Sequence, residues 1–238
     1  MLPLSDPDLI VRKTAYVNIT LISICSVVFL YELLIGTMGK YVLFYQYGLL
    51  PSEIISGNSL QILDTGVSSY PIQTPFTDLI TFITSMFLHG DLIHFASNMI
   101  YLWVFGDNIE DRFGHIGYTF FYFAAGVFAS FCHLLTDVGS QTPTVGASGA
   151  IAGVLGAYFI FYPNSRINTL VFTFFITVVQ IKALWLLGFW MILQFFQTAI
   201  GSSGVAYWAH IGGFIFGVTI AYLLKNFKIK PRSKFLKL

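Results

Sequence analysis

Three short polar clusters interrupt a strongly apolar sequence and carry the side chains best suited to chemistry. His94 and Asn98 lie four residues apart, Ser148 is the centre of Gly-Ala-Ser-Gly-Ala, and His210 precedes Ile-Gly-Gly. A histidine that takes the hydroxyl proton is a standard way of making a serine nucleophilic. Ser148 and His210 are therefore predicted to be a nucleophile and its general base, a pairing suited to acyl transfer.

Other catalytic classes are excluded by what the sequence lacks. It contains no His-Glu-x-x-His metal motif, no acidic residue after Asp137, and no pair of apolar segments with the two aspartates of an aspartyl protease. A third catalytic acid would have to be Asp91, Asp107 or Glu110, and the last two are expected at the far end of their helix. We therefore predict a serine–histidine dyad that needs no metal and no other cofactor.

His94 and Asn98 are candidates for stabilising the charge that develops during acyl transfer. Residues four apart share one face of a helix, and the developing oxyanion needs hydrogen-bond donors aimed at it. The His94 ring, the Asn98 amide and the backbone N–H of Ser148 would supply three such donors. In the alternative, His94 and Asn98 are a buried hydrogen-bonded pair that only holds their helix to its neighbours.

The composition indicates what kind of protein must hold these residues. Of the 238 residues, 56% are hydrophobic and 10% are charged, and the net charge is +1. The segments 14–31, 138–165 and 183–224 contain no charged residue, and each is long enough to cross a bilayer core of ~30 Å. We therefore predict an all-α, polytopic membrane protein. A soluble enzyme, a disulfide scaffold, a disordered chain and a nucleic-acid-binding protein are excluded.

The predicted architecture is a bundle of six transmembrane helices over residues 14–224, with a long membrane-associated first loop. The predicted spans are about 14–31, 87–105, 117–135, 145–162, 183–199 and 205–224. Glycines, prolines and aromatic residues in the loop 36–84 are typical of a structured segment in the membrane interface. The apolar run 167–181 is too short for a span, so an interfacial or re-entrant connector is predicted there.

Lysine and arginine residues orient the bundle, because they gather in cytoplasmic loops. The tail 1–13 and the basic tail 225–238 both carry them, so both termini are expected in the cytoplasm, as an even number of spans requires. The site would then open to the extracytoplasmic side, and the expected location is the plasma membrane. The glycine-rich turn 201–204 would lie above the site and is suited to a movable lid.

Small residues predict that the fourth and sixth spans pack directly against each other. Gly149 with Gly153, and Gly213 with Gly217, repeat at the four-residue spacing that lets two helix backbones approach closely. Ser148 would then lie opposite His210, at a similar depth of ~7 Å below the outer surface. In the alternative, the glycines serve ordinary bundle packing and the Ser148 hydroxyl bonds to its own helix backbone.

At this point the sequence resembles the rhomboid intramembrane serine proteases, from the first loop to the end of the sixth predicted span. The matching segments are 87–94 with Asn98, 105–106 with Glu110 and 112–114, 146–150, and 209–213. Their order and spacing agree with the family, so the combined pattern is much more specific than any one segment.

The resemblance implies roles for the polar residues. Ser148 would be the nucleophile and His210 the base. His94 and Asn98 would help to form the oxyanion hole beside the Ser148 backbone. Gly146 would let its loop approach the substrate backbone. The implied substrates are single-span or polytopic membrane proteins, cut within or next to their transmembrane segments in the lipid bilayer. No oligomeric state is implied.

The sequence departs from the family in two places. Ala152 stands where many relatives carry a tyrosine stacked on the base, and the first loop lacks a Trp-Arg pair found in some relatives. The packing around His210 and the shape of that loop are therefore expected to differ. His89 is expected to be structural, and Glu110 and Arg112 are expected to hold the turn after the second span.

Two other functions are compatible with the same architecture. A catalytically silent relative would bind membrane proteins without cutting them, but such a protein typically lacks the serine or the base. A channel or transporter would carry polar groups through the full depth of the bundle. Here the inner halves of the fourth and sixth spans, 154–161 and 214–224, are apolar, which favours a reaction site over a conduit.

Overall fold

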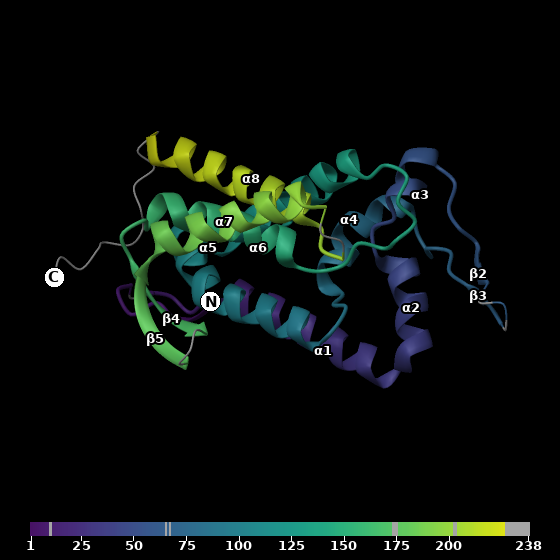
Figure 1. Ribbon diagram of the computed structural model, residues 1–238, viewed down its shortest axis with the longest axis horizontal. Coiled ribbons are helices and arrows are strands. Elements are labelled where there is room, and N and C mark those ends of the chain that lie inside the picture. The colour runs from purple at the N-terminus through teal and green to yellow at the C-terminus, as the bar shows by residue number, and fades with distance from the viewer. Residues whose placement is uncertain (10, 65, 67, 173–175, 202–203, 227–238) are drawn as a thin grey trace.

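The computed structural model describes the chain apart from residues 10, 65, 67, 173–175, 202–203 and 227–238. Most of it is helical, and the longer helices lie side by side in one bundle (Figure 1). They are α1 (Tyr16–Leu34), α5 (Leu92–Thr136), α6 (Ser148–Phe161), α7 (Ala183–Ala199) and α8 (Tyr207–Asn226). Helix α6 is the central one, because eleven of its fourteen residues are buried against its neighbours.

Helices α1, α5 and α8 are long and apolar enough to cross a membrane, whereas α6 and α7 are apolar but shorter. Helix α5 contains two arms, because Gly114 has a non-helical backbone with φ 73°. In a straight helix Leu102 and Tyr118 would be about 24 Å apart. The Asn18 side chain nevertheless donates to the Leu102 carbonyl at 2.9 Å and accepts from the Tyr118 hydroxyl at 2.8 Å. The chain therefore folds back at Gly114.

The two arms of α5, 92–113 and 115–136, correspond to the predicted spans 87–105 and 117–135 with shifted boundaries. The first arm begins five residues late because Ser85–Phe87 form a separate 3-10 turn, labelled η2. It also continues through the charged residues 107–113, which were predicted to be a turn. Those residues stay helical because the reversal is concentrated at one glycine.

The first loop is structured, as predicted. It contains the helices α2 (Gly36–Tyr47), α3 (Pro51–Ser56) and α4 (Thr81–Thr84), the 3-10 turn η1 (Asp78–Ile80), and a hairpin of β2 (Ile62–Asp64) and β3 (Ser69–Pro71). Leu49 and Thr144 exchange two backbone hydrogen bonds of 3.0 and 2.8 Å. This bridge ties the first loop to the segment that leads into α6.

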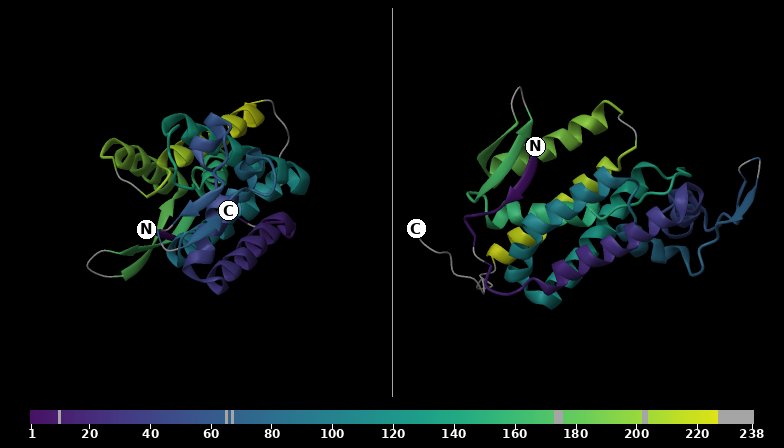
Figure 2. Two further views of the ribbon diagram at one scale, coloured as in Figure 1. Left: turned by 90° about the vertical axis from the view of Figure 1, so that its right-hand side faces the viewer. Right: turned by 90° about the horizontal axis from the view of Figure 1, so that it is seen from below.

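The prediction of an all-α protein is wrong at the other end of the bundle. There, β1 (Leu2–Ser5), β4 (Arg166–Phe172) and β5 (Ile176–Lys182) form an antiparallel sheet in the order β1-β4-β5. Figure 2 shows this sheet projecting from the helices, with the N-terminal strand along its edge. The connector 167–181 is thus largely a β-hairpin, and residues 2–5 of the predicted tail are part of a sheet. The connector contains many β-branched residues, which favour strands. A hydropathy average does not reveal this preference.

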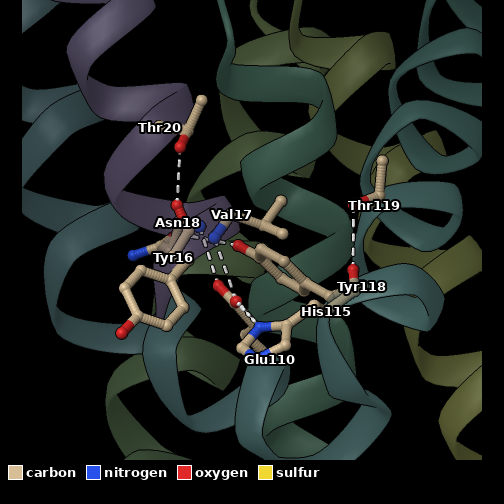
Figure 3. Close-up of polar contacts among 8 residues, drawn as sticks. All are labelled: Tyr16, Val17, Asn18, Thr20, Glu110, His115, Tyr118 and Thr119. Atoms are coloured by element: carbon tan, nitrogen blue, oxygen red, sulfur yellow. Dashed lines mark hydrogen bonds and ion pairs between the residues drawn. The ribbon is translucent and has the colours of Figure 1, made fainter. Parts of the chain in front are cut away.

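A buried carboxylate fixes the start of α1 against the turn of α5 (Figure 3). Glu110, only 1% exposed, accepts backbone N–H bonds from Val17 at 3.0 Å and Asn18 at 2.7 Å. Its other contact is His115 Nδ1, 2.5 Å from Oε1. Because Ala15 offers no side-chain cap, the Glu110 carboxylate satisfies the first N–H groups of α1 from another helix. Glu110 therefore holds the turn, as predicted.

Candidate active site

The hydroxyl of Ser148 and the ring of His210 meet at the N-terminal ends of two neighbouring helices. Ser148 is the first residue of α6, and His210 lies in the first turn of α8. Ser148 Oγ is 2.8 Å from His210 Nε2, and both side chains are half-buried. This is hydrogen-bonding distance between a hydroxyl and a ring nitrogen, which is the geometry that a serine nucleophile and a general base require.

The approach of α6 to α8 depends on glycines. A Cβ atom added to Gly213 would overlap the backbone carbonyl of Gly149, and one added to Gly217 would overlap that of Gly153. On its other side Gly149 faces α5, where an added Cβ would lie 2.7 Å from that of Ala129. The two helices therefore touch backbone to backbone, as the small-residue pattern predicted.

The second nitrogen of His210 has a partner that the sequence analysis missed. Gln194 Oε1 lies 2.7 Å from His210 Nδ1, and Gln194 is only 7% exposed. The signal was present in the sequence, because an amide inside an apolar membrane helix usually bonds to another helix. Trp190, one turn earlier on α7, places its ring 5.7 Å from the His210 ring at 33°. This aromatic ring is a neighbour of His210, and Ala152 is fully buried.

Asp91, the remaining candidate for a catalytic acid, is engaged elsewhere. Asp91 is the N-cap of α5, and its carboxylate accepts the backbone N–H groups of Ile93 at 2.8 Å and His94 at 2.9 Å. These bonds, first of all the one from His94, lower the pKa of Asp91 below its ordinary value. Among the described residues, the hydrogen-bond partners of the His210 ring are Ser148 and Gln194, and neither is a carboxylate.

His94 lies beside the serine, held against a glycine that has no space for a side chain. Gly146 has φ 127°, and an added Cβ would lie 2.7 Å from His94 Nε2 and 3.7 Å from Ser148 Oγ. The Gly146 N–H donates to the Ser85 carbonyl at 2.8 Å, which fixes the loop. The His94 ring, the Gly146 backbone and the Ser148 hydroxyl therefore border one small space.

Asn98 and His89 lie further back. One N–H of the Asn98 amide donates to the His94 carbonyl at 3.0 Å, and Asn98 is 5% exposed. The structure therefore brings Asn98 next to His94 but gives it no hydrogen bond to Ser148. His89 is fully buried, its backbone N–H donates to Glu32 at 3.1 Å, and its ring meets that of His94 edge-on at 5.3 Å. These contacts support the position of His94.

The first turn of α6 presents backbone N–H donors next to Ser148. The first backbone hydrogen bond of this helix runs from Ile151 to the Ala147 carbonyl, so the N–H groups of residues 148–150 have no partner within the helix. The positive end of the helix dipole points the same way. Negative charge that forms beside Ser148 would therefore meet N–H groups that have no partner within their helix.

Two further expectations bear on the site. The predicted lid, 201–204, contains Ser202 and Ser203, which lie outside the described residues. In the part of the chain that the structure describes, no three histidine, cysteine or acidic side chains come together in a way that could hold a metal ion.

Comparison with known proteins identifies the family. Residues 77–227, more than half of the chain, match the Rhomboid domain. The chain belongs to the rhomboid family, which confirms the resemblance seen in its motifs, and it is an integral membrane protein.

Three relatives illustrate the match. The chain is 34% identical over 143 residues to the presenilin-associated rhomboid-like protein, mitochondrial, of Mus musculus, covering 57% of this chain and 36% of the relative. It is 30% identical over 145 residues to RHOMBOID-like protein 5 of Arabidopsis thaliana, covering 60% and 43%. It is 28% identical over 169 residues to Rhomboid protein 1, mitochondrial, of Saccharomyces cerevisiae, covering 66% and 45%. The chain thus spans less than half the length of these curated relatives.

Proposed function

We propose that this protein is an intramembrane serine endopeptidase of the rhomboid type, which hydrolyses peptide bonds within or next to the transmembrane segments of other membrane proteins. The observation that carries the proposal is the 2.8 Å contact between Ser148 Oγ and His210 Nε2 at the start of α6. Membership of the rhomboid family adds the substrate class, because the resemblance implies membrane-protein substrates.

In the proposed mechanism, Ser148 Oγ attacks the carbonyl carbon of the scissile bond while His210 Nε2 takes the hydroxyl proton. The resulting oxyanion accepts hydrogen bonds from the backbone N–H of Ser148 and from the His94 ring, with Asn98 contributing its second N–H. His210 then donates its proton to the leaving amine, which departs. Water hydrolyses the acyl-enzyme by the same steps, with His210 again as base.

We also propose that the bundle crosses the membrane six times, with α1, the two arms of α5, α6, α7 and α8 as the crossings. Cations gather at the end of α6 opposite Ser148. The Arg112 guanidinium lies 3.9 Å from the centroid of the Phe161 ring, and Lys225 donates to the Ile160 carbonyl. Nearby, Arg166 lies opposite Lys182 in the strand register of β4 and β5. This end is the cytoplasmic one by the positive-inside rule. The site then opens to the opposite, extracytoplasmic side, and both tails, 1–13 and 225–238, are cytoplasmic.

Two membranes are candidates. The plasma membrane is the location expected from the sequence, and the names of two relatives refer to mitochondria. Fractionation of cells that express the tagged chain distinguishes them, because plasma-membrane and mitochondrial markers separate.

The experiment that tests the activity is cleavage of a model single-span protein by the purified chain in liposomes. We expect Ser148→Ala and His210→Asn to abolish cleavage. Ser23→Ala is the matched control, because Ser23 is exposed on α1 and its hydroxyl donates to the Ile19 carbonyl of its own helix. A fluorophosphonate probe should label the wild type and not Ser148→Ala. Labelling equal in the two would show that Ser148 is not the nucleophile, and a protein without labelling or cleavage would be a binding protein instead.

A further inference from the structure

A buried amide on α7 faces the base of the dyad. Gln194 is one of the few polar side chains buried inside the bundle, and α7 is otherwise almost wholly apolar. Burying an amide without hydrogen bonds is costly. Gln194 avoids that cost with two bonds, one to its own helix and one to His210.

The two bonds fix the direction of the amide and the tautomer of the histidine. Gln194 Nε2 donates to the Trp190 carbonyl at 3.1 Å, which leaves the Oε1 oxygen to face His210 Nδ1 at 2.7 Å. An amide oxygen only accepts, so Nδ1 must carry the ring proton. Nε2 then has a free lone pair directed at the Ser148 hydroxyl, 2.8 Å away. This is the tautomer that a general base requires.

The same helix also restrains the plane of the ring. Trp190 and Gln194 are four residues apart and therefore lie on one face of α7. The centroids of the Trp190 and His210 rings are 5.7 Å apart, and the Tyr207 ring meets the His210 ring edge-on with a centroid distance of 6.3 Å. One face of α7 thus sets both the position of the ring and the identity of its protonated nitrogen.

We propose that Gln194 is a positioning residue, the third member of a Ser148–His210–Gln194 triad, a role that rests on the proposed function. During acylation the Ser148 proton moves to Nε2, and the imidazolium keeps its Nδ1–H bond to the Gln194 oxygen until Nε2 protonates the leaving amine. A neutral amide orients the ring as an aspartate would, but it stabilises the imidazolium less.

Two substitutions separate positioning from mere packing. Gln194→Met keeps the length and volume of the side chain but removes the acceptor. We expect kcat to fall on the order of 10- to 100-fold, less than the ~10⁴-fold lost when the aspartate of a triad is replaced, while KM is unchanged. Gln194→Glu keeps an acceptor and adds a negative charge. We expect it to cleave faster than Gln194→Met, with the acid limb of its pH profile moved to higher pH by about one unit or more.

The sign of that shift follows from charge, because a carboxylate beside Nδ1 favours the imidazolium, which cannot act as a base. The other titratable side chains that bear on His210 are His94 and His133 from α5 and Tyr207 from α8. They are unchanged in every variant, so a difference between profiles reports on position 194. Gln197→Met is the matched control, since Gln197 is a half-buried glutamine on the same helix and is not a partner of His210.

The readouts are steady-state cleavage and the rate of fluorophosphonate labelling, both from pH 5 to 9, with thermal melting as the measure of folding. If Gln194→Met does not fold, the profile of Gln194→Glu decides alone. An active wild type whose kcat and pH profile survive both substitutions would refute this inference. A loss in Gln194→Met without a shift in Gln194→Glu would also refute it, by showing a structural role. A wild type that neither cleaves nor labels would instead refute the proposed function, and this inference with it.

Discussion

Gly146 and His94 lie so close together that no methyl group fits between them: a Cβ on Gly146 would be 2.7 Å from Nε2 of the His94 ring. The contact matters because it occurs immediately before Ser148, the proposed nucleophile, where the chain enters α6. It also coincides with a positive φ of 127° at Gly146, a backbone conformation that side chains disfavour.

Gly146→Ala is therefore expected to damage the site more than the fold. The methyl group must displace the His94 ring or the loop, and misplacement by about an ångström at a reacting centre lowers rates by roughly 10- to 100-fold. Cleavage of a single-span substrate measures the effect. Gly139→Ala, in the same loop but with open space around its Cβ position, should cleave like the wild type. Equal rates for both variants would contradict the close contact.

Glu110→Gln is expected to destabilise the protein without removing a reacting group. The substitution takes away the negative charge that receives the first N–H groups of α1 and the His115 ring (Figure 3). A loss of about 1–3 kcal/mol is expected for a buried charged hydrogen bond, seen as a lower melting temperature in detergent. Asp111→Asn is the control at the next position, and it should melt near the wild type. If the two variants melt at the same temperature, the Glu110 carboxylate that caps α1 does not contribute to the free energy of unfolding.

The lowered pKa of Asp91 predicts that the folded protein loses stability in acid. Backbone N–H bonds, chiefly from His94, lower its pKa in the folded protein. A lowered carboxyl pKa gives stability above the unfolded value of 3.8 and loses it as the pH falls through the folded value. Asp91→Asn still caps α5 but does not titrate, so its melting temperature should fall less between pH 6 and 3. Asp91→Ala should lose about 1 kcal/mol at neutral pH. Parallel pH curves for wild type and Asp91→Asn would overturn this account.

Asp6 predicts a pH dependence of opposite sign. Its carboxylate accepts hydrogen bonds from Tyr158 and from Ser165 at 2.8 Å, beside β1. Burial raises the pKa of Asp6 above 3.8, so the folded state holds this proton more tightly than the unfolded state. Its contribution to stability is present below the unfolded value and is lost as the pH rises through the folded value. Asp6→Asn should remove that slope in a melting series, whereas Asp64→Asn, in the hairpin of β2 and β3, should keep it.

The sequence predicts the long helices well where the pattern is local. The span 183–199 coincides with α7 (Ala183–Ala199). The span 145–162 begins three residues too early, because tertiary contacts hold the preceding segment extended: Thr144 pairs with Leu49, and Gly146 donates to Ser85. Such long-range bonds leave no trace in a local hydropathy pattern.

The candidate site likewise contains some features that a local sequence pattern predicts and others that it does not. The small-residue repeats are enough to predict that Ser148 and His210 come together, because close helix packing depends on the two segments alone. Gln194 is not predicted, because one amide hardly changes the mean hydropathy of a 17-residue apolar helix. The sheet of β1, β4 and β5 is not predicted, because the high hydropathy of the 15-residue run 167–181 indicates a membrane-associated segment, although its β-branched side chains favour strands.

Helix α6 is shorter than the thickness of a membrane. Fourteen residues cover roughly 21 Å, about 9 Å less than a typical hydrocarbon core. Because eleven of its fourteen residues are buried against its neighbours, α6 meets protein rather than lipid, and its length need not match the bilayer. On the proposed function, this short central helix keeps Ser148 below the membrane surface and leaves room beyond its N-terminus for water and an unwound stretch of substrate.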